Sequence, residues 1–107
     1  MSGLGEMGNL LRQAQEMQRQ IDRMRSELRG RTVTGIAGGG VVRVELTADR
    51  HEVKKVEISP EALRSGDPTL VADLVASAFQ DGLKRASDIE RESFGRITGG
   101  LQLPGLF

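Results

Sequence analysis

The chain has 107 residues, no Cys, Trp or Tyr, and 15 basic and 15 acidic side chains, so its formal net charge is zero. This length predicts one domain with a single modest core. The lack of cysteine excludes disulfides and thiolate zinc sites and is consistent with a reducing cytoplasm. No apolar run approaches the roughly 20 residues of a membrane span, and the first residues do not resemble a signal peptide. We therefore expect a cytoplasmic protein without a membrane partner.

An apolar stripe with a period of 3.5 residues indicates the first element. Its positions are alternately three and four residues apart, the spacing that joins one helix to another along a seam. The residues between them are mostly polar helix formers, and Gly30 follows as a stop signal. We predict a helix over residues 6–29. The stripe consists of Met7, Leu10, Ala14, Met17, Ile21, Met24 and Leu28.

A glycine run, Gly35 and Gly38–Gly40, follows the first short strand and precedes an alternating apolar segment. A phosphate-binding glycine loop requires a helix behind it and a Lys followed by Ser or Thr. Neither feature follows this run. The glycines therefore indicate a hairpin turn, where positive φ is accessible to glycine, and they argue against a nucleotide site.

Three short strands are predicted within residues 32–58, paired as an antiparallel meander. In the middle strand the apolar side chains all fall on one face, which predicts a sheet covered on one side. In the last strand Val53 is out of phase with Val56 and Ile58, which predicts a bulge near Lys54. The expected strands are Thr32–Thr34, Val42–Thr47 and Glu52–Ile58.

Two prolines preceded by capping residues predict the remaining helices. Ser59 precedes a short helix over 60–64, and Asp67 precedes a long helix over 68–97 that Gly99 and Gly100 end. Residues 98–107 are expected to form a mobile tail. The fold class is therefore α+β, in the order α-β-β-β-α.

The lengths of these elements predict a homodimer. The last helix is roughly 40 Å long at about 1.5 Å per residue, while strands of about seven residues reach only some 24 Å. Both helices must therefore cover their overhanging apolar faces against each other or against a second chain. We expect two copies, with helix pairs that project beyond a central sheet.

Five segments in this order resemble the YbaB/EbfC family of bacterial nucleoid-associated proteins, over essentially the whole chain. The resemblance implies a small, tweezer-shaped cytosolic dimer that binds double-stranded DNA and belongs to the nucleoid. The turn at 48–51 departs from the Asn-Gly or Gly-containing turn that is commoner in the family, which puts only the turn geometry in doubt. The matching segments are Asn9–Gln18, Val33–Val44, Val56–Pro60, Leu74–Leu83 and Gly99–Gly105.

The charge distribution points to the surface that would meet DNA. Residues 1–31 contain six Arg against four acidic side chains, so the amino-terminal third is mildly basic. Duplex DNA is bound through its phosphates by Arg and Lys. We expect one group of cations on the outer side of the first helix and a second group near the projecting end of the last helix. The candidates are Arg12, Arg19, Arg23, Arg25, Lys84, Arg85 and Arg91.

Two alternatives stay open for these cations. Glu16, Asp22 and Glu27 interleave with the arginines at spacings that also suit ion pairs within one helix. Specific base recognition is not expected, because the chain has no helix-turn-helix spacing and no zinc finger. The hypothesis is therefore weak binding of duplex DNA with little sequence preference.

Enzyme functions find little support in the sequence. His51 is the only histidine and lies in a predicted turn, where a solvated ring is expected in place of a catalytic base or metal ligand. Glu90 and Glu92 do not share a helix face, and Asp88 is placed to offset Arg91. We expect no catalytic residues, metal, cofactor or small-molecule substrate.

A helical adaptor that binds other proteins, for example proteins of DNA repair or replication, is the alternative function. The methionines Met7, Met17 and Met24 form a soft apolar surface that accepts varied partners, although dimer packing also explains them. Zero net charge favours the adaptor, and the matching segments favour DNA.

Overall fold

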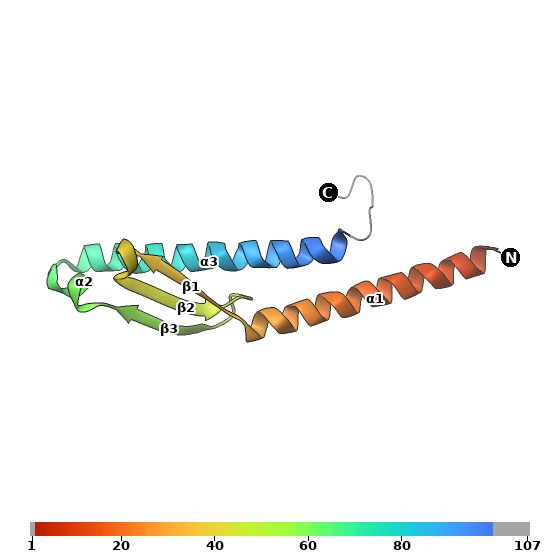
Figure 1. The fold of residues 1–107 in the computed structure, drawn as a ribbon, viewed down its shortest axis with the longest axis horizontal. Helices are drawn as coiled ribbons and strands as arrows, with labels where there is room; N and C mark the ends of the chain where they lie inside the picture. Colours follow the sequence, from red (N-terminus) through yellow and green to blue (C-terminus); the bar gives the residue numbers. More distant parts are fainter. Residues whose placement is uncertain (1, 100–107) are drawn as a thin grey trace.

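One small sheet and one helix form the packed part of the molecule, and a second helix extends from it (Figure 1). The computed structural model describes residues 2–99. The molecule measures 77 × 26 × 16 Å along its principal axes. The predicted α+β class and element order are confirmed. The elements are α1 (Ser2–Gly30), β1 (Thr32–Ala37), the single 3-10 turn η1 (Gly38–Gly40), β2 (Val42–Thr47), β3 (Val53–Ile58), α2 (Pro60–Arg64) and α3 (Pro68–Thr98).

The sheet is an antiparallel meander in the order β1-β2-β3, as predicted. Lys55 of β3 pairs with Glu45 of β2, whereas Val53 pairs with the next residue, Leu46. This leaves Lys54 as the extra residue of a bulge, which confirms the position expected from the broken alternation. The bulge turns Val53 to the same face as Val56.

Gly35 corrects the interpretation of the glycine run. It lies inside β1, opposite Val44, and only the three glycines of η1 form the turn, each with positive φ. A Cβ at Gly35 would overlap the carbonyl oxygen of Ala78 and the amide nitrogen of Gly82, both on α3. Gly35 is therefore needed because helix and strand backbones meet there, a contact that no local sequence signal announces.

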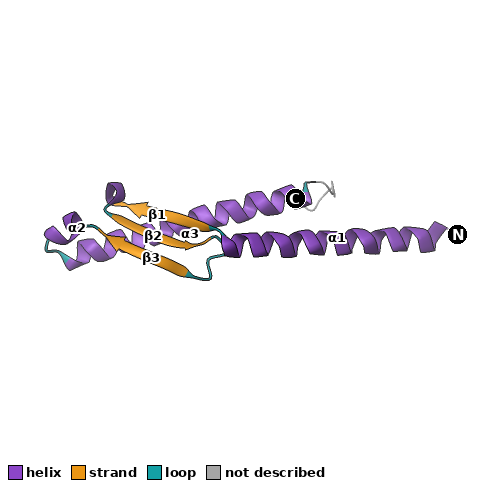
Figure 2. Ribbon diagram, turned by 60° about the horizontal axis from the view of Figure 1, so that its bottom comes forward, coloured by secondary structure: helices purple, strands orange, loops and turns teal. Residues whose placement is uncertain are grey.

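α3 crosses one face of the sheet and packs on β1 and β2 (Figure 2). Small residues of α3, Ala78 and Ala86, face the apolar side chains of β2 and are fully buried with Val42 and Val44. This confirms the one-sided sheet predicted for the middle strand. Every residue of β3, in contrast, is exposed.

α1 is packed at one end and bare at the other. Leu28 is only 4% exposed and Met24 is also buried, so the last turns of α1 belong to the core. Met7 and Leu10 of the same stripe are 60% and 65% exposed. Residues 3–16 of α1, here called the arm, are exposed except for the partly buried Gly8, and the arm extends past the end of α3 (Figure 1).

The two expected helix caps differ. The Asp67 carboxylate accepts hydrogen bonds from the amides of Thr69 and Leu70, as predicted for the start of α3. Ser59 precedes α2 but its side chain makes no capping hydrogen bond, and its buried hydroxyl has no partner among the described residues. At the other end, α3 reaches Thr98, one residue beyond the prediction. Gly100 and the tail to Phe107 lie outside the described residues.

Candidate nucleic-acid interface

Three of the predicted cations share the outer face of α1. Arg12, Arg19 and Arg23 are seven and four residues apart, which places them in one line on the side opposite the apolar stripe. All three are exposed. The guanidinium of Arg12 donates to the carbonyl oxygen of Gly8 at 3.4 Å, and Arg19 lies 3.6 Å from the Glu16 carboxylate. The line begins on the arm and continues to the part of α1 that meets α3.

Arg25 faces elsewhere. Two positions after Arg23, it is turned about 200° around the helix from that residue. It lines a concave surface between α1, α3 and the β2–β3 turn, together with Arg29 and Arg50. The sequence reasoning did not single out Arg29 or Arg50, because the turn that brings them together can be placed only when the fold is known.

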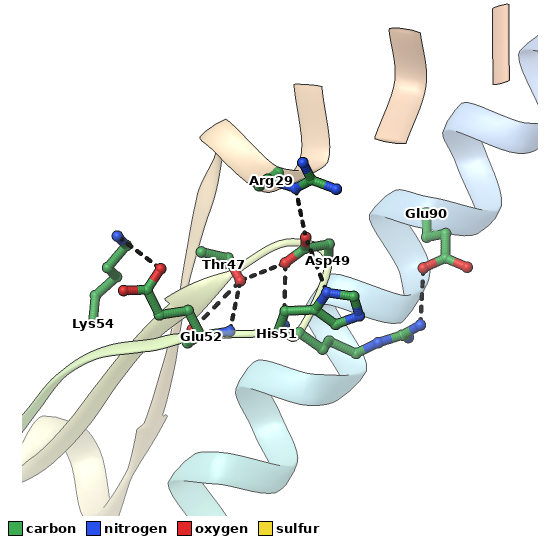
Figure 3. A network of polar contacts seen from close by, with 8 residues as sticks. Arg29, Thr47, Asp49, His51, Glu52, Lys54 and Glu90 are labelled. Atoms are coloured by element: carbon green, nitrogen blue, oxygen red, sulfur yellow. Dashed lines mark hydrogen bonds and ion pairs between the residues drawn. The ribbon is translucent and has the colours of Figure 1, made fainter. Parts of the chain in front are cut away.

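The β2–β3 turn is held to both helices by polar contacts (Figure 3). Arg50 has a positive φ of 65°, and its guanidinium lies 2.8 Å from the Glu90 carboxylate of α3. Asp49 accepts hydrogen bonds from the Thr47 hydroxyl at 2.6 Å and from the His51 amide at 3.1 Å. These hydrogen bonds lower the pKa of the Asp49 carboxyl, and the nearby cations reinforce the shift.

His51 and Arg29 approach the same carboxylate. The His51 ring is 80% exposed, in agreement with the expected solvated turn position, and its Nδ1 lies 3.6 Å from Asp49. The Arg29 guanidinium lies 3.8 Å from Asp49 and connects the end of α1 to the turn. In residues 2–99 no three His, Cys, Asp or Glu side chains are grouped so that they could hold a metal ion.

The cations of α3 are distributed differently from the expectation. Arg85 was expected near the projecting end of the helix, but it lies beside the start of β1. Its guanidinium is 3.0 Å from Asp81, whose carboxylate also accepts the Ile36 amide of β1 at 2.9 Å. That amide hydrogen bond lowers the pKa of Asp81, and Arg85 adds to the effect. Arg85 thus supports a contact between helix and strand.

The other two cations of α3 lie on its outer face. Lys84 and Arg91 are seven residues apart and exposed, and Arg91 lies 3.6 Å from Asp88. The pairing of Arg91 with Asp88 confirms that expectation. The acids Asp73, Asp81 and Asp88 accompany these cations along the helix. α3 therefore offers a mixed surface, whereas the outer line of α1 is the more basic one.

Ion pairs within one helix account for part of the candidate set. Arg19, Arg85 and Arg91 each have a partner three or four residues away. Within the part of the chain that the structure describes, no ion pair is formed by the remaining candidates, Arg12, Arg23, Arg25 and Lys84. The candidates do not form one patch, because Arg12 lies on the arm and Arg85 beside the sheet. None of the described helices is long and apolar enough to cross a membrane.

Comparisons with known proteins place this geometry in a family. The sequence profile of the YbaB/EbfC DNA-binding family matches residues 3–101. A nucleoid-associated protein of Pelotomaculum thermopropionicum is 41% identical over 103 residues, which cover 96% of this chain and 97% of that protein. The crystal structure of an uncharacterized protein from Helicobacter pylori has the same fold, with a TM-score of 0.65, 22% identity, and coverage of 82% of this chain and 88% of that one. The chain belongs to the YbaB/EbfC DNA-binding family.

Proposed function

We propose that the protein binds double-stranded DNA as a homodimer, weakly and with little sequence preference, as a component of the bacterial nucleoid. The observation that carries the proposal is the line of Arg12, Arg19 and Arg23 on the outer face of α1. Side chains on that face do not pack into the core, so they are available to phosphates. The name of the Pelotomaculum relative supports the nucleoid location.

The exposed apolar side chains support the homodimer. Met7 and Leu10 on the arm, and Val53 and Val56 on β3, are all more than two-fifths exposed in one copy. Such surfaces on soluble proteins mark interaction sites. A twofold partner is the commonest solution, and it doubles the number of basic helices that a duplex can meet.

Contacts with phosphates explain why binding would be weak and tolerant of sequence. Arg side chains on an outer helix face reach the DNA backbone, which carries no direct sequence information. Glu16 and other acids lie between the arginines and reduce the net attraction. If about four phosphates are neutralised per dimer, the logarithm of affinity falls with the logarithm of salt concentration at a slope near −3.6.

Charge reversal on α1 tests this proposal. We expect the triple variant Arg12→Glu, Arg19→Glu, Arg23→Glu to lose retention of a random-sequence duplex in gel-shift assays at low salt while it remains dimeric. The matched control reverses three exposed arginines off the outer line, Arg31, Arg43 and Arg64. Retention of DNA by the first variant at the wild-type level, or equal loss in the control, would reject the α1 interface.

A protein-binding adaptor is the second candidate, and the bare stripe of the arm favours it. Met7 and Leu10 present a flexible apolar surface of the kind that accepts varied partner helices. Nuclease treatment of a native pull-down separates the two functions. Partners that are held through DNA disappear after treatment, whereas partners that bind the arm directly remain.

A further inference from the structure

The two edges of the sheet are treated differently. At the β1 edge, the Ile36 amide points away from β2 and donates to the Asp81 carboxylate of α3 at 2.9 Å. At the β3 edge, all six residues are exposed. An unpaired strand edge is a template for pairing with another strand. β1 is therefore protected by α3, and β3 is the edge on which a second strand can dock.

The hydrogen-bond pattern shows which β3 groups point outward. The Ser59 amide donates to the Val41 carbonyl at 2.7 Å, so the adjacent pair of Val42 and Ile58 is a non-hydrogen-bonded pair. Because the two pair types alternate in an antiparallel ladder, the backbone groups of Val56 and Ile58 face away from β2. These groups can form a new ladder with another antiparallel strand.

The charges of β3 select one self-pairing register. The strand reads Glu52-Val53-Lys54-Lys55-Val56-Glu57-Ile58. With the twofold axis at Val56, Lys55 of one copy lies opposite Glu57 of the other, and the same contact occurs twice. An axis at Lys55 or at Glu57 would place that residue opposite its own copy, and directly opposed like charges destabilise a sheet.

The apolar face of β3 also calls for a cover. Val56 and Ile58 share the face on which α3 packs and are 44% and 37% exposed. Leu83 is another exposed apolar residue, on the flank of α3 that carries Glu90, the partner of Arg50 in the β2–β3 turn. A twofold axis perpendicular to the sheet puts both α3 helices on the same face, where they border Val56 and Ile58 from two sides.

We propose that two copies join edge to edge through β3, antiparallel and centred on Val56, to form one continuous six-stranded sheet. This inference rests on the homodimer proposed above and names its surface and register. The strand edge, the outward backbone groups, the self-complementary charges and the uncovered apolar face all lie on β3. The twofold axis also directs the two arms to opposite ends of the joined sheet.

Single cysteines test the register in a chain that has none of its own. Opposed Cα atoms in a hydrogen-bonded pair are about 5.5 Å apart, within the range that a disulfide spans. Val56→Cys is therefore expected to form a covalent dimer under mild oxidation. Val53→Cys is the matched control on the same strand and face, because six positions separate Val53 from its own copy, about 20 Å.

The outcomes separate the interface from the dimer itself. Crosslinking of Val56→Cys alone supports the register. A dimer in sedimentation that crosslinks equally at Val53, or not at all at Val56, overturns this interface and leaves the homodimer standing. A wild-type monomer in sedimentation overturns both.

Exchanged charges give an independent test. Lys55→Glu and Glu57→Lys each place like charges in opposition, and we expect each variant alone to dimerise on the order of tenfold more weakly. Mixing the two variants restores complementary pairs between copies and should recover dimerisation. Lys55 and Glu57 also pair within one chain at 2.8 Å, but mixing cannot restore that contact. Absence of recovery on mixing would contradict the proposal.

Discussion

The two halves of α1 carry one apolar stripe and meet opposite fates. Met24 and Leu28 near the end of the helix are buried against the sheet and α3, while Met7 and Leu10 on the arm lie in solvent. The spacing is the same in both halves. The difference shows that a heptad pattern states the need for a partner, and the fold decides whether one chain supplies it. In this chain the body is complete and the arm and β3 are open.

Gly35→Ala is expected to have the largest effect, because it attacks the body where two backbones touch. The new methyl group would overlap Ala78 and Gly82 of α3, so α3 must move away from β1. We expect a loss of about 3 kcal/mol in the free energy of unfolding, measured by urea denaturation.

Gly82→Ala is the matched control on the helix side of this contact. Its methyl group would meet the Leu46 side chain at 2.8 Å, and a side chain can move aside more easily than backbone. The loss should therefore be smaller. Equal losses in the two variants would contradict the close backbone contact at Gly35.

Truncation along the stripe of α1 compares its two halves directly. Leu28→Ala removes a buried side chain and should cost about 2 to 4 kcal/mol of unfolding free energy. Leu10→Ala removes a side chain that one copy leaves in solvent and should cost less than about 1 kcal/mol. A Leu10 loss as large as the Leu28 loss would mean that the arm is packed in solution and would break the comparison.

The smallest expected effect concerns the clasp between α3 and the edge of β1. The pKa of Asp81 is depressed from its ordinary value of 3.8 by the Ile36 amide and by Arg85. A depressed carboxyl pKa stabilises the fold above the unfolded pKa, and this contribution disappears as pH falls through the folded pKa. Asp81→Asn should therefore show a shallower loss of stability below about pH 4 in thermal unfolding. An unchanged acid slope would show that Asp81 does not couple to folding.

The element order of the fold could be predicted because its signals are local. The broken alternation at Val53 predicted the bulge at Lys54, and the Asp-Pro sequence predicted the start of α3 at Pro68. Gly35 could not be interpreted correctly, since a glycine in a strand next to a turn looks like part of the turn until the crossing helix is known.

The candidate site was predictable residue by residue but not as a surface. The helical line of Arg12, Arg19 and Arg23 follows from spacing alone. The pairing of Arg50 with Glu90 and the contact of Asp81 with Ile36 join residues 40 and more positions apart, which no local pattern reveals. The placement of Arg85 beside β1, away from the projecting end, has the same cause.

Sedimentation equilibrium at micromolar concentration tests the central claim most directly, namely that the surfaces left open by one copy are completed by another. The account predicts a species of twice the 11.6 kDa chain mass. A single species at the mass of one chain would contradict it.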